Sequence, residues 1–490
     1  MKPGLISYAT LALLAASLVG CGLLPKVGSD YQPAAPIAPA AWQAVTPLPH
    51  NGDPAELADW WRQWDDPLLA DLIAAVEADN AGLAQAWARI QQARNEMVTA
   101  GVAERPSLDA SLNVSRATVA MAGPVLHQVT RQVGLMSNWE IDLFGGIARR
   151  QEATEASYAA SRSRWHEARV SLAAETALAF LQTRFLERRL QLAGVDLASR
   201  RETARITRQL NVAGFQSNQI AAMADAAAAE SAASLTSLRA DYDQQIKALV
   251  ALSGIVEPEL RSRLAARRGQ FAQSARFRID SLPAALLAQR PDIAAAERDV
   301  AAASAAIGQA ESYRYPRLQL LGSLTPLHLT TDGSTISTTT WSIGAGLEMP
   351  LINGGRIDAN IDAAKAQYAA AAAQYRQKAR DAVREVEQAL VRLDAAGQRE
   401  ADLRQAAAGY QQALSATRSR YQAGLAGPLE LEEVSRLALA ADTNLAAWQH
   451  EHATAWVALY RAVGGGWQAG SSVPTQTTTP IAQNQAGKRS

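Results

Sequence analysis

Hydrophobic and polar residues alternate over four stretches of the chain, which predicts four β-strands. Over 107–118, the residues Leu108, Ala110, Leu112 and Val114 fall on one face and polar residues fall on the other. The further candidates are 129–143, 318–331 and 336–351. Glycine or proline occurs between the members of each pair of stretches. The chain is therefore expected to form two β-hairpins.

Long stretches without proline predict unusually long helices. Residues 146–212 and 355–423 contain no proline, and a helix of about 65 residues is about 100 Å long. Apolar residues recur in them at coiled-coil spacings, at Leu178, Phe185 and Leu192, and at Val383, Val386, Leu390 and Leu393. Two flanking helices, 66–104 and 217–253, are each about half as long. Helices of these lengths suit a cylinder wall better than a globular domain.

The same elements occur twice because the chain contains an internal repeat. Residues 80–90 align with 290–300, and 211–217 align with 421–427, both at a spacing of 210 residues. Between these landmarks, 104–108 align with 314–318, and 139–147 align with 347–357. Each copy spans about 170 residues and is expected to form a helix, two strands, a long helix, a turn and a helix.

The N-terminus has the pattern of an export signal. A lysine at position 2 precedes an apolar run over 5–19 that is too short to span a bilayer comfortably. The run ends in Leu18-Val19-Gly20-Cys21, which resembles the lipobox of bacterial lipoproteins and predicts lipidation of Cys21. The residue after the cysteine is Gly22 and not the aspartate associated with inner-membrane retention, which indicates the outer membrane. The alternative is an ordinary secretory peptide with an unrelated cysteine.

Composition and motifs give no sign of catalysis or of nucleic-acid binding. Lys+Arg and Asp+Glu balance at 47 each, so no basic surface suits nucleic acid. Cys21 is the only cysteine, which excludes an intrachain disulfide and a multi-cysteine zinc site. None of the six histidines forms an i, i+4 ligand pair, and the glycine clusters at 354–355 and 464–466 lack the lysine of a phosphate loop. We therefore expect no enzyme activity, no metal and no cofactor beyond a covalent lipid.

Several ordered motifs resemble one protein family. They are WWRQWDDPLLADLIAAV at 60–76, NWEIDLFGGIARR at 138–150, LLAQRPDIAAAERDVAAASAAIGQAESYRYPRL at 286–318, PLINGGRI at 350–357 and ALYRAVGGGW at 458–467. Together they are similar to the TolC-like outer membrane factors, in the branch called the NodT family of efflux lipoproteins. The resemblance implies a homotrimer whose strands form one barrel in outer-membrane lipid and whose helices form a periplasmic tunnel. It also implies a periplasmic adaptor and an inner-membrane pump as partners.

The expected fold class is α+β, with a long α-helical coiled-coil barrel, an antiparallel transmembrane β-barrel built from a trimer, and an internal two-fold repeat. Two hairpins cannot close a barrel alone, because open edges in lipid leave backbone groups without hydrogen bonds. We expect Leu108, Leu112, Leu318 and Leu320 to face lipid. The pairs Gly145-Gly146 and Gly354-Gly355 fall where strands must turn into long helices, although an ordinary linker would also explain them.

The expected domains follow the repeat. They are a signal peptide at 1–20, a lipidated proline- and alanine-rich tether at 21–59, a first repeat at 60–253 with its hairpin at 107–143, a connecting equatorial segment at 254–285, a second repeat at 286–466 with its hairpin at 317–351, and a disordered tail at 467–490.

The family resemblance also implies a gate where the long helices turn. Family members carry inward-facing acidic residues at the positions that match Glu430 and Glu433, which lie three apart on one helix face. Three copies would form a ring of carboxylates that favours cations. Tyr421 resembles a family tyrosine that ties the closed helices together. The alternative is that acidic residues after Pro428 only stabilise the start of a helix.

The sequence thus predicts the outer-membrane channel of a tripartite efflux system, lipid-anchored and extending into the periplasm, that exports small toxic compounds with a proton-driven pump. The alternatives are the duct of a type I protein secretion system, a lipid-anchored coiled-coil scaffold and an outer-membrane lipoprotein enzyme. The cargo is not encoded in any motif, because a duct is passive and its pump selects the substrate.

Overall fold

The computed structural model describes residues 26–33, 42–44, 57, 60–64, 66–120, 125–267, 289–468 and 470–473. The signal peptide, Cys21, most of the expected tail and residues 268–285 of the expected connecting segment lie outside the described residues. The chain divides into two compact units. Unit 1 comprises Met1–Ala35, Ala88–Arg162 and Ala295–Arg376, and unit 2 comprises Pro36–Trp87, Ser163–Ala294 and Gln377–Ser490.

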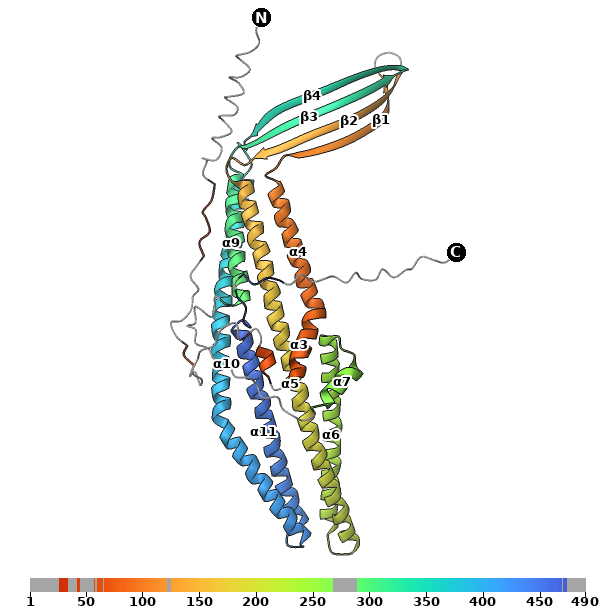
Figure 1. Ribbon diagram of the computed structural model, residues 1–490, viewed down its shortest axis with the longest axis vertical. Helices are drawn as coiled ribbons and strands as arrows, with labels where there is room; N and C mark the ends of the chain where they lie inside the picture. Colours follow the sequence, from red (N-terminus) through yellow and green to blue (C-terminus); the bar gives the residue numbers. More distant parts are fainter. Residues whose placement is uncertain are drawn as a thin grey trace, which may run out of the picture. The chain divides into compact units, whose positions relative to one another are not determined.

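Unit 1 contains one antiparallel sheet of four strands in the order β1-β2-β3-β4 (Figure 1). The strands are β1 (Ser107–Ala120), β2 (Val125–Ile141), β3 (Arg317–Thr331) and β4 (Ser334–Glu348). The two hairpins are those that the alternating pattern predicts, but β2 and β4 begin earlier and end earlier than expected. Pairing of β2 with β3 joins the hairpin of one repeat to the hairpin of the other.

The strand register brings apolar residues from all four strands together on one face. Leu112 lies opposite Val133, and Leu324 lies opposite both Leu135 and Trp341. Because directly opposed residues point to the same side of a sheet, Leu108, Leu112, Leu318 and Leu320 share this apolar face. Within the described protomer the face is open to solvent, since Leu112 is 74 % and Ile343 is 83 % exposed.

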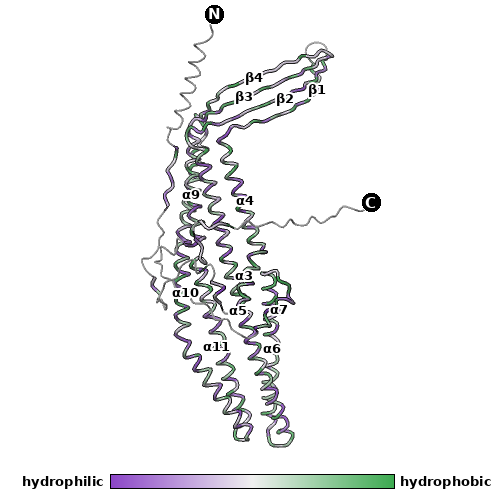
Figure 2. The backbone as a smooth tube through the Cα atoms, viewed as in Figure 1, coloured by the Kyte–Doolittle hydropathy of each residue, from purple (hydrophilic) through white to green (hydrophobic). Residues whose placement is uncertain are grey.

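The opposite face of the sheet carries most of the polar side chains of the strands, together with Leu321, Leu327 and Leu329 of β3, and is called the polar face below. It carries Ser111, Asn113, Gln132, Ser323 and Thr340, among other serine, threonine and amide side chains. Figure 2 shows the resulting alternation of polar and apolar residues along the strands. The sheet is therefore a single layer with one mainly apolar and one mainly polar surface.

The helices include two of 67 residues, α5 (Gly146–Val212) and α10 (Arg356–Gln422). The shorter ones are α3 (Pro67–Asp79), α4 (Ala81–Val102), α6 (Asn218–Ser253), α7 (Glu257–Ala265), α9 (Pro291–Ser312) and α11 (Pro428–Ala462), with a 3-10 turn η2 (Trp60–Gln63). No described helix combines the length and the apolar character needed to cross a membrane.

The prediction of one continuous helix over 66–104 is wrong, because the helix is interrupted at Asn80. This residue adopts an extended backbone with φ −87° and ψ 125°. Its side-chain oxygen accepts a hydrogen bond from the backbone N–H of Gly82 at 2.8 Å. Asparagine competes in this way with helical hydrogen bonds and caps the next helix. The segment is therefore two helices, α3 and α4.

The core of unit 2 contains aromatic residues and small residues. Trp60 stacks on Tyr460 with ring centroids 5.1 Å apart. On α10 the expected seam of Val386, Leu390 and Leu393 is buried in this core, which confirms that part of the prediction. On α5 the expected seam is wrong: Leu178 is 38 % exposed, and the buried stripe consists of Ala173, Ala177, Phe180 and Leu181. Alanine allows the helices to approach closely there.

Buried arginines tie the helices of unit 2 together. Arg290 donates to both carboxylate oxygens of Asp292 at 2.9 and 2.7 Å, to Glu385 on α10 at 2.9 Å and to the backbone carbonyl of Ala462 on α11 at 2.8 Å. Burial alone would raise the pKa of Asp292, but the hydrogen bonds and charge of Arg290 hold it below its ordinary value. Arg290 thus joins three helices through one guanidinium group.

Candidate functional site

The turns that follow the two long helices have the same backbone geometry. The N–H of Phe215 donates to the carbonyl of Leu210, and the N–H of Leu425 donates to the carbonyl of Arg420, each at 2.8 Å. Gly214 and Gly424 take φ of 81° and 76°, which only glycine adopts readily. The turns are therefore two copies of one Schellman-type helix ending, at positions related by the sequence repeat.

The two predicted gate carboxylates lie on exposed parts of α11, near its start. Glu430 pairs with Arg420 at 2.6 Å, and Glu433 pairs with Arg436 at 2.7 Å. Their side chains are 42 % and 57 % exposed. The hydrogen bond from Arg436 lowers the pKa of Glu433. Both carboxylates are thus exposed surface groups, and each has an arginine partner in its own chain.

The intervening Glu432 has a different environment. It is half-buried and pairs with Arg200 on α5 at 2.5 Å. Arg200 also pairs with Asp196 at 2.8 Å, and Asp196 accepts a hydrogen bond from Ser231 on α6 at 2.8 Å. Burial raises the pKa of Glu432, and the charge of Arg200 acts in the opposite direction. These four side chains connect α5, α6 and α11.

Sequence reasoning missed this cluster. The i, i+4 spacing of Asp196 and Arg200 on α5 marks an ion pair within one helix, but nothing in the sequence connects it to Glu432 on α11.

Tyr421, the other predicted gate residue, is half-buried. Its hydroxyl has no hydrogen-bond partner among the described residues, and burial raises its pKa. Among the described residues, the Tyr421 hydroxyl therefore forms no hydrogen bond between helices, whereas Glu432 forms an ion pair between α11 and α5.

The strand-to-helix junctions contain the four predicted glycines. Gly145, Gly354 and Gly355 take φ of 78°, 61° and 83°. Gly146 begins α5 with ordinary backbone angles, but a Cβ there would lie 2.4 Å from the hydroxyl of Ser312. Gly145 thus provides a left-handed turn, and Gly146 allows a close approach of α5 to α9.

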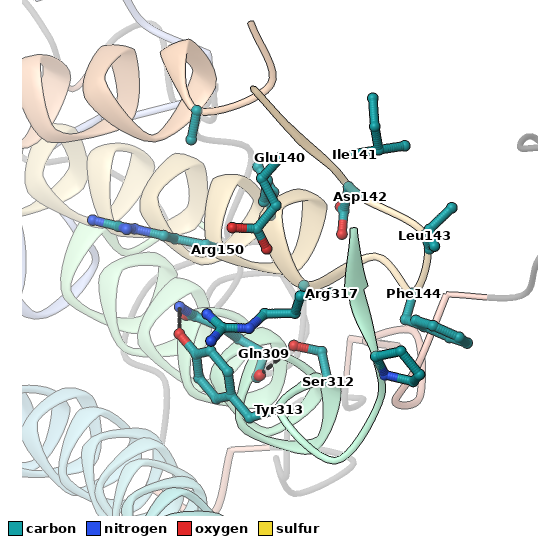
Figure 3. A pocket seen from close by; sticks show the side chains of 14 residues that line it. Glu140, Ile141, Asp142, Leu143, Phe144, Arg150, Gln309, Ser312, Tyr313 and Arg317 are labelled. Atoms are coloured by element: carbon teal, nitrogen blue, oxygen red, sulfur yellow. Dashed lines mark hydrogen bonds between the residues drawn. The ribbon is translucent and has the colours of Figure 1, made fainter. Parts of the chain in front are cut away.

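A cavity of about 280 Å³ lies at the first junction, among residues of unit 1 (Figure 3). Glu140, Arg150, Gln309, Tyr313 and Arg317 are among the side chains that line it. The neighbouring Asp142 accepts a hydrogen bond from the backbone N–H of Ala148 at 2.8 Å and so caps α5. The cavity is lined by both acidic and basic side chains, so its charge favours no particular ligand.

The N-terminal segment is attached to this junction. The backbone N–H of Val27 donates to the carbonyl of Phe144 at 3.0 Å. Arg149, which is 2 % exposed, donates to the carbonyls of Val27 and Gly28 at 3.0 and 2.8 Å and pairs with Asp30 at 2.9 Å. Residues 27–30 of the expected tether are therefore held at the base of the sheet by specific hydrogen bonds and an ion pair.

A single-layer sheet with an exposed apolar face, joined to very long helices, defines a membrane channel protein and not an enzyme. The sequence supports this independently, because residues 72–255 and 282–465 each match the family model described as outer membrane efflux protein. The chain belongs to the outer membrane efflux protein family, and it acts as a passive efflux channel of the outer membrane. The two matched segments also fit the internal repeat.

Relatives cover nearly the whole chain. It is 28 % identical over 450 residues to nodulation protein T of Rhizobium leguminosarum bv. viciae, which covers 90 % of this chain and 92 % of that protein. It is 28 % identical over 474 residues to outer membrane protein OprJ of Pseudomonas aeruginosa, covering 94 % and 96 %. The solved outer-membrane channel OprN aligns with a TM-score of 0.79 and 28 % identity over 90 % of this chain and 99 % of that chain.

Proposed function

We propose that the chain forms a lipid-anchored homotrimer that serves as the outer-membrane duct of a tripartite efflux system and exports small toxic compounds. The observation that carries the proposal is the sheet of unit 1. Among the described residues, its outer strands β1 and β4 each leave one edge without a partner strand. In lipid such an edge leaves backbone groups without hydrogen bonds, so the sheet must close with further copies. Head-to-tail pairing of β4 with β1 of the next copy closes a ring.

Three copies of four strands would form a twelve-stranded barrel, which lies within the known range for outer-membrane barrels. Its apolar face would meet lipid and its polar face would line the pore. The helices would continue the passage on the periplasmic side, where an adaptor and an inner-membrane pump would dock.

The test of this proposal is cross-linking in cells followed by identification of the captured inner-membrane protein. Capture of a proton-driven pump would support the proposal. Capture of an ATP-driven protein exporter would contradict the proposed export of small compounds.

The names of relatives support a small cargo. Relatives that are 27 % identical to this chain include the solvent efflux pump outer membrane protein SrpC and the toluene efflux pump outer membrane protein TtgI, both of Pseudomonas putida. A matching phenotype is expected: a strain without the gene becomes more susceptible to organic solvents and hydrophobic toxins. Unchanged susceptibility in a strain that lacks other efflux channels would contradict this cargo class.

The lipid anchor on Cys21 is supported by the attachment of Val27 to the base of the sheet. Cys21 precedes Lys26 by five positions, and the side chain of Lys26 lies against Gly145. An extended chain of this length reaches about 17 Å. A lipid on Cys21 can therefore enter the leaflet next to the strand ends without displacing the segment.

Replacing Cys21 with alanine is expected to lower the yield of assembled protein without abolishing insertion, because the barrel itself also embeds in lipid. Mass spectrometry of the mature N-terminal peptide and quantification of protein in outer-membrane fractions check this prediction. An unmodified cysteine in the wild-type protein, or a cleavage site elsewhere, would contradict lipidation.

The gate prediction concerns the exposed carboxylates of α11. The double replacement Glu430→Ala and Glu433→Ala is expected to weaken block by trivalent cations and to lower cation selectivity, because it removes six carboxylates from the trimer. Trimer yield should stay the same, since both groups form only exposed pairs. Single-channel recordings with hexaamminecobalt(III) measure both properties. Unaltered block and selectivity would show that these residues only stabilise the helix start.

A further inference from the structure

Basic side chains gather at one end of the otherwise apolar face of the sheet. They are Arg116 on β1, His127 and Arg131 on β2, and His328 on β3, and all four are exposed. The strand register places them on the same side of the sheet as Leu112 and Leu324. They lie toward the hairpin turns, at the end of the strands that is remote from the helices (Figure 1).

The register also brings these side chains close together. Arg131 lies directly opposite His328. Arg116 lies opposite Val129, two residues before Arg131, so the two arginines are diagonal neighbours on adjacent strands. Diagonal neighbours lie about 7–8 Å apart, within reach of long side chains. Two guanidinium groups can therefore bind the same ligand.

The cluster has no acidic counterpart on its face. The described residues of β1 to β4 place no aspartate or glutamate on this side of the sheet. The nearby Asp332 lies in the turn between β3 and β4, where its carboxylate accepts a hydrogen bond from the backbone N–H of His127 at 3.1 Å. Neither Arg116 nor Arg131 forms an ion pair with a described residue. Both arginines are thus available to an external partner.

The position along the strand places the cluster at the edge of the membrane. Ten residues separate Ile141 at the base of β2 from Arg131. At about 3.4 Å per residue and a tilt of about 40°, they span about 25 Å of depth, which equals the height of a barrel's apolar band. Arginine is costly at the membrane midplane and nearly neutral at the interface. The cluster therefore lies at the level of the headgroups in the outer leaflet.

We propose that Arg116 and Arg131, with His127 and His328 beside them, bind the phosphate groups of an anionic lipid headgroup in the outer leaflet. Planar guanidinium groups form paired hydrogen bonds with phosphate oxygens, and two of them on one lipid-facing surface match a phosphorylated glycolipid. The apolar residues below the cluster would contact the acyl chains of the same molecule. The inference rests on the proposed function, since it needs the apolar face to lie in lipid.

The test is native mass spectrometry of the full-length protein in detergent, titrated with diphosphoryl lipid A. The double variant Arg116→Gln and Arg131→Gln is expected to bind this lipid at least about tenfold more weakly than the wild type. The matched control is Arg105→Gln with Arg150→Gln, which removes two exposed arginines near the base of the strands. The control should bind like the wild type.

Two further arms identify the ligand. A dephosphorylated glycolipid with the same acyl chains should bind as weakly to the wild type as diphosphoryl lipid A binds to the double variant. Inorganic phosphate should not displace diphosphoryl lipid A at equal concentration. Equal losses in both double variants, tight binding of the dephosphorylated lipid, or displacement by inorganic phosphate would each overturn the inference. If the wild type forms conducting trimers that bind no lipid, only the inference fails; if it forms no trimer, the proposed function fails.

Discussion

Replacement of Leu112 by arginine is expected to reduce recovery of the assembled trimer from outer membranes. Leu112 is 74 % exposed on the apolar face and lies opposite Val133, another apolar residue of that face. An arginine that faces lipid costs up to about 2–4 kcal/mol, so three copies in a trimer cost up to about 6–12 kcal/mol. A loss of this size is comparable to the entire stability of a typical domain.

The neighbouring residue provides the matched control. Ser111 points to the polar face, opposite Gly134, where a charged side chain would enter the pore. Ser111→Arg is therefore expected to retain most of the trimer. Quantitative blotting of unheated outer-membrane samples compares the two variants. Equal losses would show that the assignment of the two faces is wrong.

Replacement of Arg290 by glutamine is expected to destabilise unit 2 by about 3–5 kcal/mol, because it leaves buried Asp292 without its cationic partner. Thermal unfolding of the detergent-solubilised protein measures the change. The control is Arg263→Gln, which removes an arginine from an exposed pair with Glu259 and should change stability by less than about 1 kcal/mol. Similar melting temperatures for the two variants would contradict the account of the buried network.

The effect of Arg290→Gln should also depend on pH. Because the folded pKa of Asp292 is lowered, its ionised form stabilises the wild type above the unfolded pKa, and this stability is lost as pH falls through the folded pKa. Without Arg290, burial raises this pKa instead. The stability difference between wild type and variant should thus be largest above about pH 5 and should shrink in acid, where the carboxylate is protonated in both. A difference that does not vary with pH would exclude Asp292 as its cause.

Elements with a strong period were predictable from the sequence. A strand has a period of two, so the alternation at Leu108 and Leu112 gave both the strand and its apolar face. The long helices followed from the absence of proline, and the end of α5 at Val212 was anticipated. The pairing of β2 with β3 was not predictable in this way, because it joins segments from different repeats and no local turn specifies it.

The errors have physical causes. Asn80 breaks a helix through a side-chain hydrogen bond that competes with the backbone, and the hydrophobic pattern does not register this bond. The buried stripe of α5 was misplaced because alanine packs closely there, while larger residues such as Leu178 lie outside the core. The contact between α5 and α11 through Glu432 and Arg200 was not predicted. Such a pair depends on packing between distant segments.

The most direct test of the central claim is conductance in planar lipid bilayers. Purified protein, with its oligomeric state determined by native mass spectrometry, is added to one side of the membrane. A trimeric duct predicts a homotrimer that inserts to give discrete conductance steps, whereas an equal amount of Leu112→Arg should give none. A monomeric or dimeric protein, or a homotrimer that never produces conductance steps, would contradict the account.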